Sequence, residues 1–533
     1  MNIFFVNKIK KYFLLKWQQS PLQSILILAL VLRLLAAVFS QGYGMHDDHF
    51  IAIEEPWSWT QGKDYDGWLP GTKGEDSEPS IYSFFYPGIN YLLFEGMHTL
   101  GIMNPKTKMF FIRLLLGLFS LLTVYFGYQI TKHYSSEKIA KQAGLLLAVF
   151  WFMPFFGVRN LVEVVAIPLL LGSTWLILKT NYMREKDKSF LVAFFMAGLL
   201  AGLSLSVRFQ AGVYVAGMGL VFLIQKRFLS TLLFGLGTLL SFAVLQGVPD
   251  YLIWEKPFSV LEGYIQYNLA NKGAYGNQNN VFMYFQLLPG LLIPPIGLFL
   301  FFGFFLKIKN HLLVFLPSLL FLLFHTWFPN RQERFILTIV PMVIMLGVIG
   351  WEHFYNQSKW WANRNRLYKN FNRFFWIVNT LLLLAITFTY SKRSRVEAMH
   401  YFYKTEKTIN AVIIDDTGRR ETMMMPVFYA GKAFNILTIS NYDSTNMRIH
   451  YPWSYIQVSH SREVLRQPGL VAHPQYVVFV EDIDLENRVQ IMKGIYPSLA
   501  FEAYIKPSLT DRIMKKMNPH NKNEDFYIYR TGL

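Results

Sequence analysis

A dense cluster of ionisable side chains follows the first apolar segment of the chain. Between residues 46 and 55 lie His46, Asp47, Asp48, His49, Glu54 and Glu55. A carboxylate near aromatic side chains can act as a general base on a hydroxyl group, which typically contributes about 10²–10⁴-fold to a rate. The alternative is that these polar residues only end the apolar segment and solvate a loop.

The same cluster also offers oxygen and imidazole ligands that suit several divalent metal ions. The stretch His46–His49, however, has no second ligand cluster at a recognisable spacing elsewhere in the sequence. We therefore expect no metal site and no other cofactor, with a divalent metal ion as the weaker alternative.

A second group of residues that could take part in a reaction lies in FPNRQERF, residues 328–335. This stretch contains Arg331, Glu333 and Arg334 between two apolar segments. Two guanidinium groups can clamp a phosphate and offset its charge as it leaves. The alternative is that both arginines only anchor a helix end at the membrane interface.

Three more ionisable residues lie within or beside apolar segments. Arg159 and Glu163 are four positions apart, so we expect them to pair on one helix, and Arg208 lies in LSVRFQA. Ionisable side chains at such depth usually face a polar cavity. Arg33, inside the first apolar segment, is expected to pack against a carboxylate or a backbone carbonyl.

The stretch 264–285 is rich in amides, glycine and tyrosine, and it includes Tyr275, Gln278 and Asn279. Amides can hydrogen-bond to sugar hydroxyls, and aromatic faces can stack on the C–H faces of a sugar ring. The alternative is a turn-rich connector, since Gly and Asn are ordinary loop residues.

The elements that must position these groups are membrane spans. Of the 533 residues, 53% are hydrophobic and 16% are charged, against about a quarter charged in a soluble domain. Apolar runs long enough to cross about 30 Å of hydrocarbon recur along the first 390 positions. The absence of cysteine excludes disulfides and thiolate chemistry. We predict about 11 transmembrane helices, at residues 22–39, 109–131, 142–158, 160–179, 190–207, 211–225, 229–247, 285–306, 311–327, 335–351 and 373–390.

The sidedness follows from the distribution of the net charge of +17. With the basic N-terminus in the cytoplasm and the first segment as a retained signal anchor, the loops rich in Lys and Arg all fall inside. These loops are 131–141, 179–188, 225–227, 307–310 and 353–373. The sparsely basic loops 40–108 and 248–284 then lie on the non-cytoplasmic face, periplasmic or lumenal. Residues 80–102, broken by Pro and Gly, are expected to form a helix along the membrane surface.

The hydropathy falls after residue 390, which predicts two domains. Residues 1–390 form the transmembrane catalytic domain, and residues 391–533 form a small soluble α/β domain on the non-cytoplasmic side. Strands are predicted at 411–415, 475–482 and 525–529. The acids at strand ends, which are Asp415, Asp416, Glu481 and Asp482, are expected to be structural.

One reaction suits an outer base, outer arginines and a sugar-binding loop. A sugar linked to a lipid phosphate presents its anomeric carbon at the membrane surface, and the phosphate leaves as a stable anion. One carboxylate is then sufficient to take the proton of the attacking hydroxyl, and a single displacement inverts the anomeric centre. Arginines that cancel the developing charge stabilise the transition state.

The ordered set of motifs over residues 20–350 resembles the GT-C superfamily of polyprenyl-phosphate-sugar glycosyltransferases, and within it the Alg9-like and GPI mannosyltransferases. The stretch 46–49 is similar to the family's His-Pro-Asp-Glu motif, with Asp48 on the family's Asp, and 330–335 lines up with its His-Lys-Glu-Glu-Arg-Phe motif. Residues 159–173, 201–211 and 264–290 resemble three further family segments. The Pro and Glu of the first motif are Asp47 and His49 here, and a later His-Pro is replaced at Gln278–Asn279.

The resemblance implies a GT-C fold and a metal-independent, inverting transfer of a hexose such as mannose. The donor would be a polyprenyl- or dolichyl-phosphate sugar, and the acceptor a hydroxyl of a lipid-linked or cell-envelope glycan. Asp48 is the preferred base and Asp47 the second candidate. Substrate contacts are expected from His46, His49, Glu55, Arg159, Arg208, Tyr275, Gln278, Asn279, Arg331, Glu333 and Arg334.

Two alternatives stay open at this point. The chain could be a transporter or flippase of a polyprenyl-linked glycan, although such proteins usually carry ionisable residues near mid-membrane and repeated halves. It could also be an enzyme of the same fold that modifies protein or lipid A. Neither alternative predicts binding of nucleic acid.

Overall fold

The computed structural model describes residues 17–70, 79–180, 188–273, 280–306, 308–405, 408–417, 424–439, 447–451, 454–458, 474–518 and 524–533. The chain divides by its contacts into two compact units. Unit 1 comprises Met1–Ser40, Ile81–Tyr86 and Ile112–Phe388, and unit 2 comprises Gln41–Ser80, Pro87–Phe111 and Thr389–Leu533. This grouping differs from the hydropathy-based division at residue 390, because contacts join the first outer loop to the C-terminal segment.

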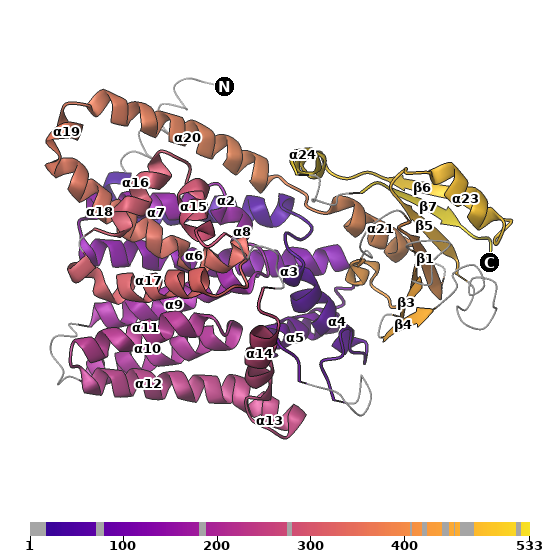
Figure 1. Ribbon diagram of the computed structural model, residues 1–533, viewed down its shortest axis with the longest axis horizontal. Coiled ribbons are helices and arrows are strands. Elements are labelled where there is room, and N and C mark those ends of the chain that lie inside the picture. The colour runs from indigo at the N-terminus through magenta and orange to yellow at the C-terminus, as the bar shows by residue number, and fades with distance from the viewer. Residues whose placement is uncertain are drawn as a thin grey trace. The chain divides into compact units, whose positions relative to one another are not determined.

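The described residues are mainly helical (Figure 1). The helices before residue 200 are α2 (Pro21–Phe39), α3 (Asp47–His49), η1 (Phe50–Glu54), α4 (Glu55–Thr60), α5 (Phe85–Thr99), α6 (Pro105–Tyr134), α7 (Glu137–Val149), α8 (Met153–Phe156), α9 (Val162–Lys179) and α10 (Lys188–Val207). Those that follow up to Phe388 are α11 (Ala211–Ile224), α12 (Phe228–Phe242), η2 (Ala243–Gly247), α13 (Val248–Trp254), α14 (Ser259–Ala270), α15 (Met283–Leu291), α16 (Ile296–Phe304), η3 (Ile308–His311), α17 (Leu312–Trp327), η4 (Glu333–Ile339), α18 (Val340–Gln357), α19 (Lys359–Ala362) and α20 (Asn365–Thr387).

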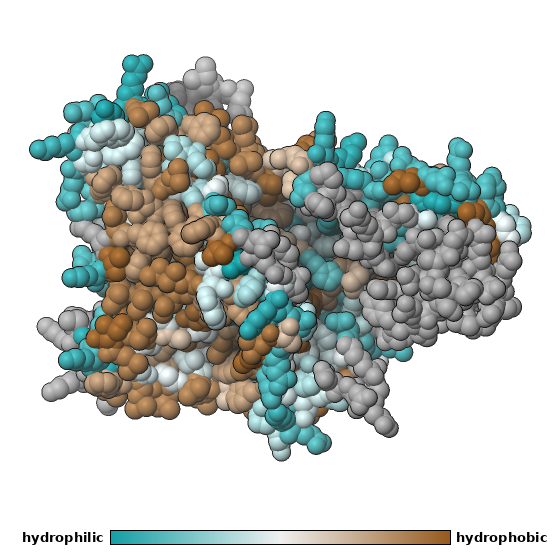
Figure 2. Space-filling model, in the orientation of Figure 1, coloured by the Kyte–Doolittle hydropathy of each residue, from teal (hydrophilic) through white to brown (hydrophobic). Residues whose placement is uncertain are grey.

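Seven helical stretches among the described residues are long and apolar enough to cross a membrane. They are Pro21–Phe39, Pro105–Tyr134, Val162–Lys179, Ser189–Val207, Phe228–Trp254, Ile308–Trp327 and Glu333–Gln357. Large apolar side chains stay exposed along them, for example Leu232, Leu236 and Leu239 of α12. Figure 2 shows such hydrophobic residues gathered over the helices of unit 1. This exposure is what a lipid-facing surface requires, so the chain is an integral, multi-pass membrane protein.

The other four predicted spans also fall mainly on helices. The segment at 211–225 is the apolar but shorter helix α11, and the segment at 373–390 covers the C-terminal part of α20. The segments at 142–158 and 285–306 are each divided, the first between α7 and α8 and the second between α15 and α16. A helix predicted at 80–102 is found as α5, and its position along the membrane surface stays a prediction.

Glycines allow two pairs of helices in unit 1 to approach closely. A Cβ atom at Gly350 of α18 would lie 2.0 Å from the carbonyl oxygen of Gly303 in α16. A Cβ atom at Gly237 of α12 would lie 2.2 Å from the carbonyl oxygen of Phe195 in α10. Small residues at such crossings are typical of helix pairs inside membranes, where van der Waals contact replaces the hydrophobic effect as the driving force.

The C-terminal end of α7 lies inside unit 1, where its last carbonyl groups need partners. Arg33 is 2% exposed and donates to the carbonyl oxygens of Leu147 and Ala148 at 3.1 and 2.6 Å. Asn379 donates to the carbonyl oxygen of Val149 at 2.9 Å. The prediction that Arg33 packs against backbone carbonyls is therefore confirmed.

Unit 2 contains a seven-stranded mixed sheet with the strand order β4-β3-β2-β1-β5-β7-β6. The strands β1, β2 and β5 pair in parallel, and the remaining pairs are antiparallel. Strands were predicted at three of these places, at β1, β5 and β7, and all three are confirmed. The elements of this part are α21 (Arg393–Lys404), β1 (Ala411–Asp415), η5 (Val427–Ala430), β2 (Asn435–Ile439), β3 (Met447–Tyr451), β4 (Ser454–Val458), β5 (Tyr476–Val480), α23 (Leu485–Lys493), β6 (Ala500–Ile505), α24 (Leu509–Met517) and β7 (Phe526–Arg530).

The helix α23 packs on one face of the sheet, where Val489 and Met492 join the buried side chains of the parallel strands. The same helix buries Arg488, whose Nε lies 3.3 Å from Oδ2 of Asp415 at the end of β1. This guanidinium also donates to the carbonyl oxygens of Val480 and Ile483. Asp415 thus has the structural role that the sequence predicted.

Candidate functional site

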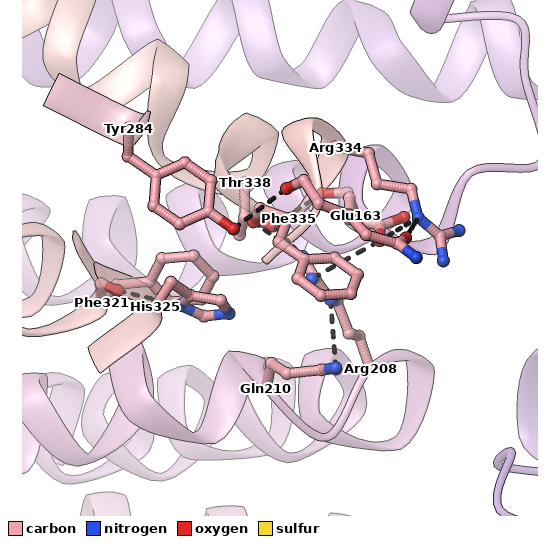
Figure 3. A network of polar contacts seen from close by, with 10 residues as sticks. Glu163, Arg208, Gln210, Tyr284, Phe321, His325, Arg334, Phe335 and Thr338 are labelled. Carbon is pink, nitrogen blue, oxygen red and sulfur yellow. Dashed lines mark hydrogen bonds and ion pairs between the residues drawn. The ribbon is translucent and has the colours of Figure 1, made fainter. Parts of the chain in front are cut away.

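Three charged side chains from separate elements of unit 1 meet in a polar network (Figure 3). Glu163 lies in the first turn of α9, Arg208 directly follows α10, and Arg334 lies in η4. Oε1 of Glu163 is 3.5 Å from a terminal nitrogen of Arg208 and 3.8 Å from Nε of Arg334. The formal charges of the three residues sum to +1, so the network favours an anion beside it.

Uncharged groups fix the orientation of both arginines. Arg208 donates to the Thr338 hydroxyl at 2.7 Å and to Oε1 of Gln210 at 3.2 Å. Arg334 donates to Oε1 of Gln332 at 2.7 Å, and the carbonyl oxygen of Gln332 accepts from the Tyr284 hydroxyl at 3.0 Å. The guanidinium groups are therefore held before any ligand arrives.

The network is not fully satisfied within the described part of the chain. Oε2 of Glu163 is buried and forms no hydrogen bond with any described residue. The terminal nitrogen of Arg208 that faces Oε1 of Glu163 at 3.5 Å is also buried and has no hydrogen bond to a described residue beyond this ion pair. Burying polar groups without hydrogen bonds is costly. These atoms could therefore hydrogen-bond to a polar ligand.

An apolar pocket of about 440 Å³ lies beside this network, between α14, the end of α17 and residues 328–335. Gln210 and Phe335 line the pocket and also contact Arg208. The remaining wall is largely apolar and aromatic, formed by Tyr264, Ile265, Leu269, Phe324, Trp327, Phe328 and Pro329, with Asn268, Lys272, His325 and Asn330 as its polar members. A mostly apolar pocket with a few polar groups is the usual form of a small-molecule site.

His325 was missed by the sequence analysis and lies in the wall of this pocket. Its Nδ1 is 2.9 Å from the carbonyl oxygen of Phe321, which only accepts, so Nδ1 carries a hydrogen. Nε2 is buried and has no hydrogen-bond partner among the described residues. A lone histidine late in the apolar run LLVFLPSLLFLLFHTW was the signal that could have found it.

The other predicted arginines have separate partners. Arg159 lies before α9, which begins at Val162, so the prediction that it pairs with Glu163 along one helix is wrong. Arg159 instead donates to the Ser40 hydroxyl at 3.0 Å. Arg331 donates to the carbonyl oxygen of Thr326 at 3.0 and 2.7 Å. Glu333 is exposed.

In unit 2, the acidic segment, residues 46–55, contains the short helix α3, which continues into the π-helical turn η1. Asp48 is 5% exposed, and its two carboxylate oxygens accept hydrogen bonds from the amides of Gly44 and Met45 at 2.9 and 3.1 Å. Asp47 is half-buried and His46 is exposed. The two amides orient the Asp48 carboxylate.

The π-helical turn η1 brings together residues that are five positions apart, because its hydrogen bonds run from i to i+5. Nε2 of His49 is 2.9 Å from Oε1 of Glu54, and both side chains are fully buried. The His49 ring stacks between Tyr43 and Tyr429, at centroid distances of 4.6 and 5.4 Å. Turns of this kind often occur at functional sites.

Glu55 is also fully buried, next to Asp64. Its oxygens accept from Nε1 of Trp59 at 3.1 Å and from the amide of Asp66 at 2.8 Å. Burial and the neighbouring Asp64 raise the pKa of Glu55 to about 10. The side chain is therefore protonated at neutral pH.

Three predicted contact residues, Tyr275, Gln278 and Asn279, lie outside the described residues. Within the described ranges, no group of three or more His, Asp and Glu side chains is arranged to hold a metal ion. The expectation of a reaction without a cofactor stays a prediction.

Comparison with known proteins identifies a family and solved structures that are similar to this chain. Residues 24–418 match the model of the Alg9-like mannosyltransferase family. No curated protein sequence matches the chain. The structure of ArnT from Cupriavidus metallidurans bound to undecaprenyl phosphate is similar, with a TM-score of 0.60, 12% identity, and coverage of 95% of this chain and 97% of that one. The Archaeoglobus fulgidus oligosaccharyltransferase in complex with Zn and sulfate has a TM-score of 0.53, 11% identity, and coverage of 91% and 72%. The predicted GT-C fold is thereby confirmed.

Proposed function

Since the chain belongs to the Alg9-like mannosyltransferase family, we propose that it transfers a hexose, mannose in the first instance, from a polyprenyl- or dolichyl-phosphate donor. The acceptor is a hydroxyl group of a lipid-linked or cell-envelope glycan. The observation that carries the proposal is the Glu163–Arg208–Arg334 network beside an apolar pocket. One neighbour of the same fold, ArnT, has been solved with undecaprenyl phosphate bound, which supports a donor of this class.

The apolar pocket and the charged network suit the two parts of such a donor, its isoprenoid chain and its phosphate. An isoprenoid chain is apolar and fits the aromatic wall of the pocket, formed in part by Phe324, Trp327 and Phe328. The phosphate carries the negative charge that Arg208 and Arg334 favour, since guanidinium groups bind phosphate oxygens through fixed, charge-assisted hydrogen bonds.

The acidic segment supplies the base in this proposal. Asp48 is assigned to the acceptor hydroxyl, because its carboxylate is oriented by two amides and shielded from bulk water. Asp47, which is more exposed, is the second candidate. A general base must present a lone pair to the proton that it takes.

The reaction is a single displacement. The acceptor oxygen forms a bond to the anomeric carbon, and the bond between that carbon and the phosphate oxygen breaks. The electron pair leaves with the lipid phosphate, whose charge is offset by the arginines, and the acceptor proton moves to the carboxylate. The product has the inverted configuration because no glycosyl–enzyme intermediate forms.

The side of the membrane is part of the proposal. The distribution of Lys and Arg among the loops supports a cytoplasmic N-terminus, and with it a non-cytoplasmic position for the loop at 40–108 and for residues 391–533. The transfer is therefore assigned to the periplasmic or lumenal face, on an acceptor that is exposed there.

The test uses the full chain in lipid nanodiscs with polyprenyl-phosphate mannose and extracted lipid-linked glycans. We expect Asp48→Asn to lower kcat by about 10²–10⁴-fold with donor binding retained, whereas the exposed control Asp482→Asn should leave kcat unchanged. Loss of turnover in Asp47→Asn alone would move the base to that residue. Full turnover in both variants would overturn the mechanism. Movement of the intact donor across a vesicle membrane without sugar transfer would favour a flippase.

A further inference from the structure

The short helix α24 in unit 2 exposes an apolar face. Leu509, Ile513 and Met517 are 67%, 49% and 77% exposed. Their spacing of four residues places them on one side of the helix. An amphipathic helix in a soluble domain usually turns such a face towards a core, so this face is available to an apolar partner.

Basic residues flank the apolar face of α24. Arg512 and Lys516 are exposed, and at 100° per residue they lie together on one side of the stripe formed by Leu509, Ile513 and Met517. Apolar residues bordered by Lys and Arg are typical of helices that lie in a membrane interface, where the cations reach the headgroups.

The opposite side of α24 is fixed to the protein. Asp511 is 5% exposed and accepts hydrogen bonds from the backbone amides of Lys392 and Arg393, both at 3.1 Å. Ser508 and Asp511 form a capping box at the start of the helix. The orientation of the apolar face is therefore set by its own unit.

The start of α24 also contacts Thr389, the first residue of the C-terminal segment of unit 2. The hydroxyl groups of Thr389 and Thr510 are 3.3 Å apart, and Thr389 is covalently joined to Phe388 at the end of α20. A line of exposed apolar side chains runs along α20 to this point, formed by Phe374, Ile377, Leu381, Leu384 and Phe388.

A second lipid-facing helix ends at the same place. Phe39, the last residue of α2, is 45% exposed, and its ring lies 5.0 Å from that of Phe388. Two residues further along the chain, the carbonyl oxygen of Gln41 accepts from the amide of Ser391 at 3.1 Å. The apolar surfaces of α2 and α20 thus end together.

We propose that α24 is a membrane-interface helix, whose apolar face enters the surface of a lipid bilayer. Its ligand is a bilayer with anionic headgroups, which Arg512 and Lys516 attract electrostatically. The contact would hold the C-terminal part of unit 2 against the membrane. It does not depend on the reaction that the enzyme catalyses.

The absence of cysteine from the chain allows a direct test with single-cysteine variants of the full protein. Leu509→Cys, Ile513→Cys and Met517→Cys are labelled with an environment-sensitive nitrobenzoxadiazole probe in nanodiscs that contain phosphatidylglycerol. Ile483→Cys, at a position 55% exposed on the same unit, is the matched control. Doxyl-labelled lipid and aqueous iodide serve as quenchers.

We expect doxyl lipid, but not iodide, to quench the three probes on α24. At position 483 we expect iodide, but not doxyl lipid, to quench the probe. Adding Arg512→Glu and Lys516→Glu should reduce the doxyl quenching on α24. Probes that iodide quenches equally at all four positions would overturn the proposal. Probes on α24 that neither quencher reaches would also overturn it, since a protein partner or a second copy would then cover the face.

Discussion

The carboxylate of Glu54 accepts hydrogen bonds from the backbone amide of Phe428 at 2.9 and 3.0 Å, across 374 positions of sequence. The same carboxylate contacts His49, the neighbour of Asp48. Burial raises the pKa of Glu54, against the hydrogen bonds from His49 and Phe428, which lower it. One side chain thus links the proposed catalytic segment to the C-terminal part of unit 2.

Removal of this link should loosen the acidic segment. Glu54→Ala leaves the Phe428 amide and the His49 ring without their acceptor, so we expect a loss of about 1–3 kcal/mol in the free energy of unfolding. Glu54→Gln keeps one acceptor oxygen and should therefore lower the free energy of unfolding by a smaller amount. Thermal unfolding in detergent measures the effect, with the exposed Glu486→Ala as the control. An unchanged midpoint in Glu54→Ala would contradict the structural role.

The buried proton of Glu55 predicts a dependence of stability on pH. Its pKa is about 10 in the folded protein against 4.5 for a freely exposed glutamate side chain, so unfolding at a pH between these values releases a proton. The stability is therefore complete below pH 4.5 and falls as pH rises towards 10, by at most about 1.4 kcal/mol per pH unit.

We expect Glu55→Gln to flatten this slope and to be more stable than the wild type at pH 9, because the amide keeps the shape without the proton. Unfolding midpoints at pH 6, 7.5 and 9 give the measurement. Parallel slopes for the two proteins would show that another group is responsible.

Much of the fold was predictable because it follows from composition and period. Apolar length predicted the helices, and runs such as AVIID predicted the parallel strands, where side chains are buried on both faces. Arg33 was expected to pack against a carboxylate or a backbone carbonyl, and it donates to two carbonyl oxygens.

The partners of charged groups were less predictable, because they depend on contacts between distant segments. The four-residue spacing of Arg159 and Glu163 predicted a pair only if both lay on one helix, and α9 begins too late for that. Glu163 instead meets Arg208 and Arg334. The bond from Phe428 to Glu54 has no local pattern in the sequence at all.

The role of Arg334 in donor binding can be separated from interface anchoring. We expect Arg334→Gln to raise the donor KM by about tenfold or more with a smaller effect on kcat, since a charged hydrogen bond contributes about 1.5–3 kcal/mol. Arg334→Lys should recover only part of the affinity, because it lacks the planar fork. The exposed Arg366→Gln on α20 is the control. Equal donor affinity in Arg334→Gln and Arg366→Gln would leave Arg334 with an anchoring role only.

His325 provides the sharpest test of how the pocket distinguishes a sugar donor from the bare lipid. Because Nδ1 donates to Phe321, the neutral ring presents Nε2 as a buried acceptor. A protonated ring would add a third cation to a region in which one carboxylate, Glu163, already pairs with Arg208 and Arg334. We infer that Nε2 accepts a hydrogen bond from a hydroxyl group of the donor.

We expect His325→Ala to raise the KM for polyprenyl-phosphate mannose by about tenfold, the cost of a buried hydrogen bond of about 1.4 kcal/mol. Binding of polyprenyl phosphate without a sugar should change little, because that ligand offers no sugar hydroxyl. His311→Ala is the matched control, since His311 is equally buried, packs on Tyr134, and does not line the pocket. If His325→Ala weakened both ligands equally, the histidine would only support the packing of α17.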